Sequence, residues 1–530
     1  MAVYVNLDAM IPRADFAVLP NEGNEPEHLS SDKFDTVNLS NLEAGQLILS
    51  SFRKPDFQRE TNHWSPEQVV QLIESFVNNE LIPAVILWSS TSKFHIFVID
   101  GGHRLSALRA WIEDDYGDKH ISVQFFGPDI SESQKKAAKI TRRLIEQRVG
   151  SYQYLKGLFA GGTKGEDDHT RRASNMARRS VRVQWVEGNA EKAESSFYKI
   201  NTQGTPLDDV EELLIKNRHR SIAIAARSII RAGTGHKYWT IFEPNVRSQI
   251  ETLAQGTHHL LFEPETNTPI KTLDMPLGGS AGMRTTLELL IAYVILATRN
   301  QLGEPKKIED VPDDTTGELT IRALKSTLRL TSKISGDKDG SLGLHPAVYF
   351  YGPSGRHSAA LFMGMAQLIA QKLANNSETA FFKLFTRARK QMEPFLIAHK
   401  KLIALIAQQT RSSKRADVIA ILFDYMVTEF GNGRDVTRQA LVSKSGLQVE
   451  AILSESQGGG ANVKFSDETK SAAYIRQKLD SELRCPICHG YIDSAKSVSY
   501  DHIIRIAEGG HGTDENCQLV HPFCNQSIKG

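Results

Sequence analysis

The chain has 530 residues, more than one hydrophobic core usually serves, and a typical domain of roughly 100–200 residues predicts about three domains. Hydrophobic residues make up 40% and charged residues 24% of the sequence, a balance that excludes global disorder. The formal net charge of +1 identifies no class of partner, because segments of opposite charge cancel in the sum.

The cysteine distribution is more informative than the total composition. All four cysteines, Cys485, Cys488, Cys517 and Cys524, fall within the last 46 residues, which excludes a disulfide scaffold and favours a metal site in a reducing compartment. The N-terminus lacks the basic start and apolar core of a secretory signal. The longest apolar run, residues 289–297, is well short of the ~20 residues that span a membrane. We therefore expect a cytoplasmic protein with no membrane partner.

Charge is distributed unevenly along the chain. Residues 1–50 carry eight acidic and two basic residues, whereas residues 131–182 carry thirteen basic and five acidic residues. Such a basic stretch is either a solvated helix face or a surface that binds phosphate, and the sequence leaves both interpretations open.

Residues 36–220 alternate strand-like and helix-like patterns. Ser65-Pro66-Glu67-Gln68 is typical of a helix start, because Ser65 and Gln68 can form a capping box and proline suits the first turn. The further expected elements are strands at 83–88, 94–99, 121–126 and 181–186, a helix at 105–111, and a helix with Ala193, Phe197 and Ile200 on one face.

Beyond residue 220 the helical period dominates, and residues 286–297 and 396–407 are apolar enough for core helices. The glycines at 458–460 suggest a linker. The pattern predicts an α+β multidomain protein with the following segments: an N-terminal segment 1–35, an α/β domain 36–220, a helical domain 221–455, a linker 456–474 and a small C-terminal module 475–530.

Two short motifs near the C-terminus have metal-ligand spacing. Cys485 and Cys488 form one pair and His521 and Cys524 another, each with two intervening residues, so that one tight turn can aim both side chains at one ion. Four such ligands suit tetrahedral zinc, and a closed ligand set indicates a structural rather than a catalytic ion. Cys517 competes with His521 for the fourth position.

Polar residues between and after these pairs carry a resemblance. Asp501-His502-Ile503, Gly509-Gly510, Asn516 and Asn525 follow in an order and at a spacing that resemble an HNH endonuclease. The resemblance implies a ββα-metal fold, with His502 as the general base, Asp501 and Asn525 holding a catalytic Mg²⁺ or Mn²⁺, and Asn516 ordering the loop and fixing the imidazole. The alternative is a binding module that zinc stabilises and in which the Asp501-His502 pair has no catalytic role.

Three blocks in the N-terminal half carry a second resemblance. Residues 54–59 (KPDFQR), 100–105 (DGGHRL) and 201–207 (NTQGTPL), with Glu211 beyond them, resemble the ParB-like domain of GmrSD-type modification-dependent restriction enzymes and SspE-type phage-defence proteins. Phe57 stands where tyrosine is usual, and Gly102-His103 stands where two glutamines are usual. The resemblance implies that the loop at 100–104 handles an anion.

Elementary chemistry supports an anion site at this loop. A glycine pair between a strand and a helix lets backbone amides approach a phosphate at the positive end of the helix. The expected cofactor-binding residues are Gln58, Arg59, Asp100, Gly101, Gly102, His103 and Arg104. The alternative is a glycine turn in which Arg104 and Asp100 pair with each other. The chain contains no G-x-x-x-x-G-K-[ST] motif, so use of a nucleoside triphosphate would have to run through this loop.

These observations predict a DNA endonuclease of restriction or anti-phage defence. Its N-terminal half would sense nucleotide, modified DNA or a defence-system partner protein and so restrain cutting by the C-terminal module. Two other functions stay open: a non-catalytic zinc-stapled DNA-binding or regulatory protein, and an enzyme whose main output is nucleotide hydrolysis. The oligomeric state, including a homo-oligomer, also stays open.

Overall fold

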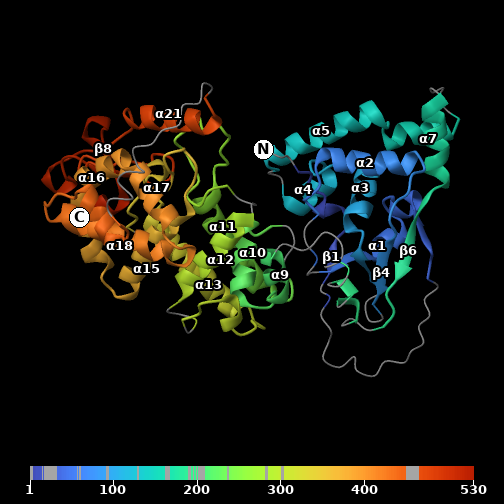
Figure 1. Cartoon of the computed structure of the whole chain (residues 1–530), viewed down its shortest axis with the longest axis horizontal. Coiled ribbons are helices and arrows are strands. Elements are labelled where there is room, and N and C mark those ends of the chain that lie inside the picture. The colour runs from blue at the N-terminus through green and yellow to red at the C-terminus, as the bar shows by residue number, and fades with distance from the viewer. Residues whose placement is uncertain are drawn as a thin grey trace. The chain divides into compact units, whose positions relative to one another are not determined.

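The computed structural model describes residues 4–14, 16, 33–55, 58, 61–90, 95–127, 130–161, 167–188, 192–194, 196–197, 200, 209–234, 238–280, 284–299, 302, 304–338, 340–448 and 465–529. The chain divides into two compact units, one of Met1–Arg218 with Thr234–Ile241 and one of His219–Gly233 with Phe242–Gly530 (Figure 1). Both helices and strands are present, as expected. Within the described ranges, none of the helices is long and apolar enough to cross a membrane.

The first unit is built around a six-stranded mixed sheet (Figure 1). Its elements are η1 (Asp8–Met10), β1 (Arg13–Ala14), β2 (Thr36–Asn38), η2 (Leu39–Leu42), α1 (Leu47–Ser51), β3 (Phe52–Pro55), α2 (Pro66–Val77), β4 (Val85–Ser89), β5 (Ile96–Asp100), α3 (Gly102–Glu113), α4 (His120–Phe126), α5 (Glu132–Arg148), α6 (Tyr152–Phe159), α7 (Asp167–Arg178), β6 (Ser180–Trp185) and α9 (Asp209–Lys216). The strand order is β1-β3-β5-β4-β6-β2. The pairs β1–β3, β3–β5 and β4–β6 are parallel, and the pairs β4–β5 and β2–β6 are antiparallel.

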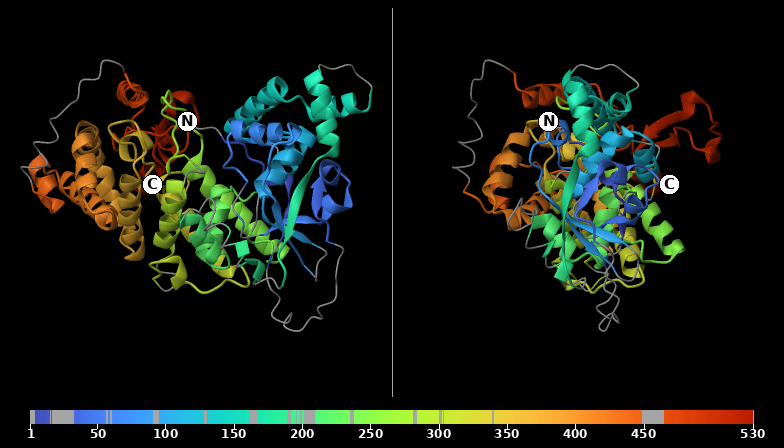
Figure 2. Two further views of the ribbon diagram at one scale, coloured as in Figure 1. Left: turned by 45° about the vertical axis from the view of Figure 1, so that its right-hand side comes forward. Right: turned by 90° about the vertical axis from the view of Figure 1, so that its right-hand side faces the viewer.

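Both faces of this sheet are buried. Along β5, Val98 packs into the large core formed with helices α2, α3, α5, α6 and α7, a layer that Figure 2 shows from two further sides. Its neighbours Phe97 and Ile99 point to the opposite face, where they pack with Ala193 and Phe197. This division follows from the alternation of side chains along a strand. Because β3 and β5 are parallel neighbours, their C-terminal ends lie at the same edge of the sheet. Gln58, after β3, bonds to carbonyls at the end of β5, so the residues that follow the two strands lie side by side.

Most expected elements of this unit are confirmed. The Ser65 side chain accepts from the Gln68 amide, and the Gln68 side chain accepts from the Ser65 amide at 2.9 Å, which completes the predicted capping box of α2. The expected strand at 121–126 is wrong, because these residues form α4. Asp115 explains the difference: its carboxylate accepts from the amides of Lys119 and Ser122 at 3.0 and 2.9 Å and so supplies the acceptors that start a helix.

A buried charge network holds the segment that connects β3 to α2. The Asp8 carboxylate accepts from Lys54 Nζ and Arg13 Nη2, both at 2.8 Å, and the side chains of Asp8 and Lys54 are completely buried. Lys54 also donates to Thr61 Oγ1 at 2.9 Å, and Arg13 donates to the carbonyl of Gln58. These bonds hold Lys54 and Gln58, two residues of the predicted motif at 54–59. The network is internal, so Lys54 serves the loop and does not face a ligand.

The basic stretch at 131–182 is partly used inside the unit. Arg142 pairs with Asp114 and Asp118, and Arg148 pairs with Glu67 and Glu74 of α2. Arg172 of α7 donates to the side chain of Asn78 and to the carbonyl of Arg148. Arg179, directly after α7, donates to backbone carbonyls in and after α2. These four cations therefore tie α5 and α7 to their own unit.

The second unit is mostly helical and ends in a two-stranded hairpin. Its elements are α10 (Ser221–Ile230), α11 (Pro244–Phe262), α12 (Arg284–Thr298), η3 (Ile308–Asp310), α13 (Glu318–Ile334), α14 (Pro346–Tyr349), α15 (Ala359–Ala374), α16 (Glu378–Ala398), α17 (Lys400–Gln409), η4 (Ser412–Lys414), α18 (Arg415–Gly431), α19 (Arg438–Lys444), α21 (Asp467–Leu479), β7 (Ser499–His502), η5 (Ile506–Glu508), η6 (Asp514–Asn516), β8 (Cys517–Val520) and η7 (Cys524–Lys529). The core helix expected at 286–297 is present as α12.

The expected helix at 396–407 and the expected linker differ from the structure or lie partly outside the described residues. The single helix expected at 396–407 is wrong, because α16 ends at Ala398 and α17 begins at Lys400, with the break at His399. Apolar residues on both sides of the break are buried, so composition alone does not reveal it. Of the linker expected at 456–474, residues 456–464 lie outside the described residues, and residues 467–474 belong to α21. The five-segment domain division stays a prediction, although residues 467–529 belong to the same compact unit as the helices.

We expect Asp8→Asn to lower the free energy of unfolding of the first unit by about 3 kcal/mol or more, because two buried cations lose their counter-charge. All five tryptophans of the chain lie in this unit, so tryptophan fluorescence during urea titration reports its unfolding specifically. The control is Glu132→Gln, since Glu132 pairs with Lys135 at the surface and its loss costs about 1 kcal/mol at most. Equal effects of the two substitutions would contradict the role assigned to Asp8.

Candidate functional site

Four potential metal ligands meet in the C-terminal part of the second unit. One ligand atom from each of Cys485, Cys488, His521 and Cys524 lies within 4.8 Å of the others, and all four residues are buried. Tetrahedral zinc with Zn–S bonds of 2.3 Å needs sulfurs about 3.8 Å apart, so the donor set fits this ion. Cys517 is exposed on β8 and lies outside the cluster.

The protonation of the cluster also favours a cation. Hydrogen bonds from the thiols of Cys488 and Cys524 lower the pKa of Cys485, and the same bond to Cys485 raises the pKa of Cys488 to about 12. Three buried sulfurs this close cannot all be thiolates unless a cation lies among them. Burial lowers the pKa of His521, which leaves its imidazole neutral and able to coordinate at neutral pH.

The hairpin β7–β8 carries two of the predicted catalytic residues. Asp501 pairs with Gln518 across the hairpin and His502 pairs with Cys517, and both Asp501 and His502 are partly exposed. The Gln518 side chain donates to Asp501 Oδ2 at 2.8 Å and so fixes the carboxylate. β8 ends at Val520, directly before His521, so the hairpin ends where the second ligand pair begins.

Asn516 closes the loop that follows His502. Its Oδ1 accepts from the Ile504 amide at 2.7 Å, and its Nδ2 donates to the carbonyls of Ile504 and His511 at 3.1 and 2.9 Å. A Cβ atom at Gly510 would lie 1.9 Å from the Ile504 carbonyl oxygen and 2.8 Å from Asn516 Nδ2, so this loop requires glycine there. Asn516 thus binds both sides of the loop between the strands.

Asn525 joins the helical turn η7 to β7. Its Nδ2 donates to Ser499 Oγ at 2.7 Å and to the Tyr500 carbonyl at 3.1 Å, the residues directly before Asp501. The carbonyl acceptor fixes the orientation of the amide and leaves Oδ1 as the atom that a hard cation would bind. The structure therefore brings Asp501, His502, Asn516 and Asn525 to one hairpin beside the ligand cluster.

The N-terminal candidate site lies where β3 and β5 end. Gln58 donates from Nε2 to the carbonyls of Val98 and Ile99 at 3.1 and 3.3 Å, and its Oε1 would be 3.2 Å from a Cβ atom at Gly102. Gly101 has a φ of +92° and precedes α3, so a side chain there would be strained. Among the described residues, the buried Gln58 Oε1 has no hydrogen-bond partner. The loop thus presents an acceptor beside a helix N-terminus.

The charged residues of this loop are already paired. Arg104 donates to Asp100 Oδ2 at 2.7 Å and to the Ala84 carbonyl at 3.0 Å, which is the ion pair that the simple glycine-turn interpretation predicts. The imidazole of His103 stacks on Trp64 with ring centroids 5.3 Å apart. Arg59 and the block at 201–207 lie outside the described residues, and Glu211 lies on α9.

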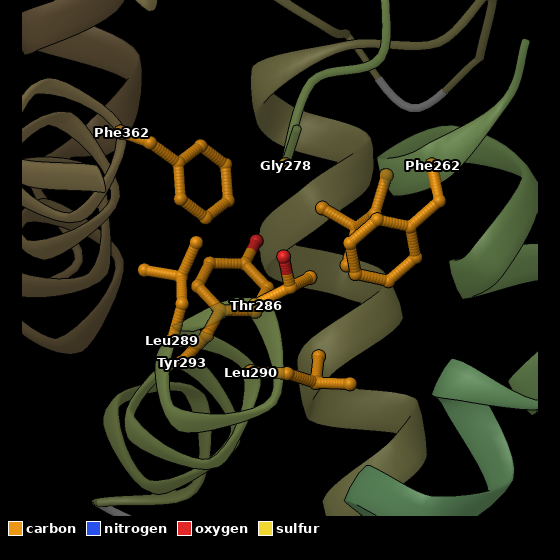
Figure 3. A pocket seen from close by; sticks show the side chains of 8 residues that line it. Phe262, Gly278, Thr286, Leu289, Leu290, Tyr293 and Phe362 are labelled. Atoms are coloured by element: carbon orange, nitrogen blue, oxygen red, sulfur yellow. The ribbon is translucent and has the colours of Figure 1, made fainter. Parts of the chain in front are cut away.

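An apolar pocket lies within the helical part of the second unit (Figure 3). Its two hydroxyls are already bonded, Tyr293 to Thr331 Oγ1 at 2.9 Å and Thr286 to the Ser280 carbonyl at 2.8 Å. The lining carries no charged side chain and consists of Leu261, Phe262, Gly278, Thr286, Leu289, Leu290, Tyr293 and Phe362. This pocket therefore supplies no group for hydrolysis.

Comparison with protein-family models matches two separate segments of the chain. Residues 39–220 match the GmrSD restriction endonuclease, N-terminal domain, and residues 485–529 match the HNH endonuclease family. The chain contains an HNH endonuclease domain and a GmrSD-type N-terminal domain. Searches of curated proteins and of solved structures found no match.

Sequence reasoning missed several residues that hold the HNH domain together. Gln518 fixes Asp501, and the Tyr491 carbonyl lies 2.9 Å from His521 Nε2. Arg389 and Glu393 of α16 contact the same cluster from more than 90 residues away. The cross-strand position of Gln518 could have been found from the hairpin register, but no local pattern marks the two α16 residues.

We expect Cys485→Ser to reduce bound zinc from about one ion per chain to near zero, because structural zinc sites need their full ligand set. Metal content after dialysis, measured by mass spectrometry, tests this. Cys517→Ser is the matched control and should retain zinc, since Cys517 lies outside the cluster. Loss of zinc from the control variant, or full retention by Cys485→Ser, would refute the assignment.

Proposed function

We propose that the protein is a metal-dependent endonuclease of restriction or anti-phage defence, which hydrolyses phosphodiester bonds of DNA at the HNH domain. The observation that carries the proposal is a hairpin with Asp501 and His502 on β7 and Asn516 directly before β8, to which Asn525 of η7 bonds, beside four buried potential metal ligands. Cleavage of incoming DNA would take place in the cytoplasm. We also propose that the HNH domain has a ββα-metal fold and that the GmrSD-type domain has a ParB-like fold.

His502 is the general base in this mechanism. It takes a proton from the attacking water, which forms a bond to phosphorus while the bond to the leaving 3′ oxygen breaks. Asp501 and Asn525 would hold Mg²⁺ or Mn²⁺, which supplies charge neutralisation for the phosphorane and the leaving oxygen. Asn516 keeps the loop after His502 closed and so orients the imidazole. The cysteine and histidine ligands hold a structural zinc that fixes this frame.

The GmrSD-type domain is proposed to regulate cutting by sensing nucleotide or DNA. The support is the positive φ of Gly101 and the helix N-terminus behind it at the end of parallel strands. A bound nucleoside triphosphate would have to displace Arg104 from Asp100. A DNA nuclease must be restrained on its host genome, which gives such a domain a purpose.

We expect His502→Ala to lower the rate of plasmid cleavage with Mg²⁺ or Mn²⁺ by roughly 10²–10⁴-fold, the usual contribution of a general base. His511→Ala is the matched control, because His511 is exposed on the same loop and contributes only its backbone carbonyl to Asn516. Both variants should keep their zinc. Unaltered nicking by His502→Ala would favour the non-catalytic, zinc-stapled DNA-binding protein.

We expect Asp100→Ala and Arg104→Ala to weaken binding of a fluorescent nucleotide with Mg²⁺ roughly 10- to 100-fold, because Arg104 would bind a phosphate and Asp100 would hold the metal ion of the nucleotide. Arg143→Ala, an exposed cation on α5, is the control. Digestion of unmodified and modified phage DNA with and without each triphosphate then shows whether binding controls cutting. Phosphate release that survives both substitutions would remove the proposed nucleotide site, and release without any cutting would favour nucleotide hydrolysis as the main activity.

A further inference from the structure

A completely buried arginine from the helical part of the second unit lies against the ligand cluster. Arg389 of α16 is 1% exposed, and its Nη1 lies 2.7 Å from His521 Nε2 and 3.3 Å from His521 Nδ1. Its Nη2 donates to the Leu342 carbonyl, and its guanidinium lies 5.3 Å from the centre of the Phe385 ring. An arginine in such a place needs a negative partner, because burying a lone charge is costly.

The geometry around His521 shows that this contact is one of charge. His521 Nδ1 is 3.2 Å from Cys488 Sγ, so Nδ1 faces the cluster, and Nε2 is 2.9 Å from the Tyr491 carbonyl, to which it can donate. A ligating histidine whose other nitrogen donates to a carbonyl is the usual arrangement at zinc. Arg389 Nη1 lies 2.7 Å from the same Nε2 and can only donate, so Nε2 either donates to the Tyr491 carbonyl or accepts from Arg389. Arg389 lies beside the ring and acts on the cluster through its positive charge.

The net charge of the zinc-bound cluster is opposite in sign to the charge of Arg389. One Zn²⁺ with three thiolates and one neutral imidazole carries a net charge of −1, and all four ligands are buried. Arg389 brings +1 to within 2.7 Å of the ligand His521, whereas the carboxylate of the buried Glu393 lies 3.8 Å from Arg389 and accepts hydrogen bonds from Tyr349 and Tyr491. Without Arg389, the thiolates would lie in a low-dielectric environment with an uncompensated charge.

The Cys485–Cys488 pair and the residues up to Tyr491 are called the first knuckle, and the His521–Cys524 pair the second. Glu393, one helical turn further on α16, connects Arg389 to the first knuckle. It lies 3.8 Å from Arg389 as an ion pair, accepts from the Tyr349 hydroxyl at 2.7 Å and accepts from the Tyr491 amide at 2.7 Å. The knuckle approaches so closely that a Cβ atom at Gly490 would lie 2.6 Å from Arg389 Cδ. One face of α16 therefore contacts both the first knuckle and the histidine of the second.

We propose that Arg389 is a positioning residue that supplies the counter-charge of the zinc site, so that the helical part of the unit completes the metal centre of the HNH domain. This inference rests on the proposed zinc site. It also explains why the knuckles contain no lysine or arginine between their own ligands: the compensating charge comes from α16. Zinc occupancy and the seating of the HNH domain on α16 are then coupled, which gives the helical part a route to influence the nuclease.

The test compares zinc affinity of the full-length chain with Arg389→Met, Arg389→Lys and Glu393→Gln, by competition with a chromogenic chelator. Arg389→Met removes the charge and should weaken zinc binding 10- to 100-fold, the usual effect of losing a partner of a metal ligand. Arg389→Lys restores a charge and should bind more tightly than Arg389→Met. Glu393→Gln removes a negative charge beside the site, so its zinc affinity should equal or exceed that of the wild type.

The Glu393→Gln variant separates charge from packing. If α16 merely fills space and bonds to the knuckle, both Arg389→Met and Glu393→Gln lose zinc together, and that result overturns the inference. Wild-type affinity in Arg389→Met overturns it as well. If Arg389→Met fails to fold, the sign of the Glu393→Gln effect still decides. A wild-type chain that binds no zinc refutes the proposed metal site itself, and the absorption spectrum of the Co²⁺-substituted protein reports its three-thiolate environment independently of cleavage.

Discussion

The HNH domain depends on three sulfurs and one imidazole that must share a small buried volume. The hydrophobic cluster of this domain contains Cys485, Cys488 and Cys524 themselves, with Ile492 and Val520 as its other fully buried members. So few aliphatic side chains cannot hold a hairpin in place, and a metal bound by the cluster would stabilise the domain instead. The hairpin β7–β8 ends at Val520, directly before the ligand residue His521, so the position of that end follows from the ligand cluster.

Both candidate sites use buried charge to hold loops that lack regular structure. In the first unit, Asp8 binds Lys54 and Arg13 and so anchors the segment with Gln58. In the second unit, Arg389 and Glu393 contact the metal-binding knuckles from α16. Charged contacts of this kind tolerate little displacement, because an unpaired buried charge is costly. Such loops are consequently held in one geometry, which a catalytic or binding site needs.

Local patterns were reliable where one short segment decides the structure. The capping box at Ser65, the strands before Asp100 and the knuckle spacing depend on neighbours within a few residues. They failed at 121–126, where the Asp115 side chain supplies helix-capping acceptors to a strand-like composition. The basic stretch at 131–182 left a solvated helix face and a phosphate surface open, and two of its cations, Arg142 and Arg148, pair with acidic residues of their own unit. In these cases the partner is outside the segment that carries the pattern.

The sequence by itself determined the chemistry of the HNH domain: two ligand pairs at the spacing of a tight turn, and an Asp-His pair between them. The tertiary structure decided which residue completes the ligand set. Cys517 pairs with His502 at the start of β8 and remains exposed, whereas His521 follows the end of that strand and enters the cluster. It also placed Arg389 against the cluster. Spacing encodes contacts within one turn, but strand register and helix packing bring together residues that are distant in sequence, and these alone set which charges meet.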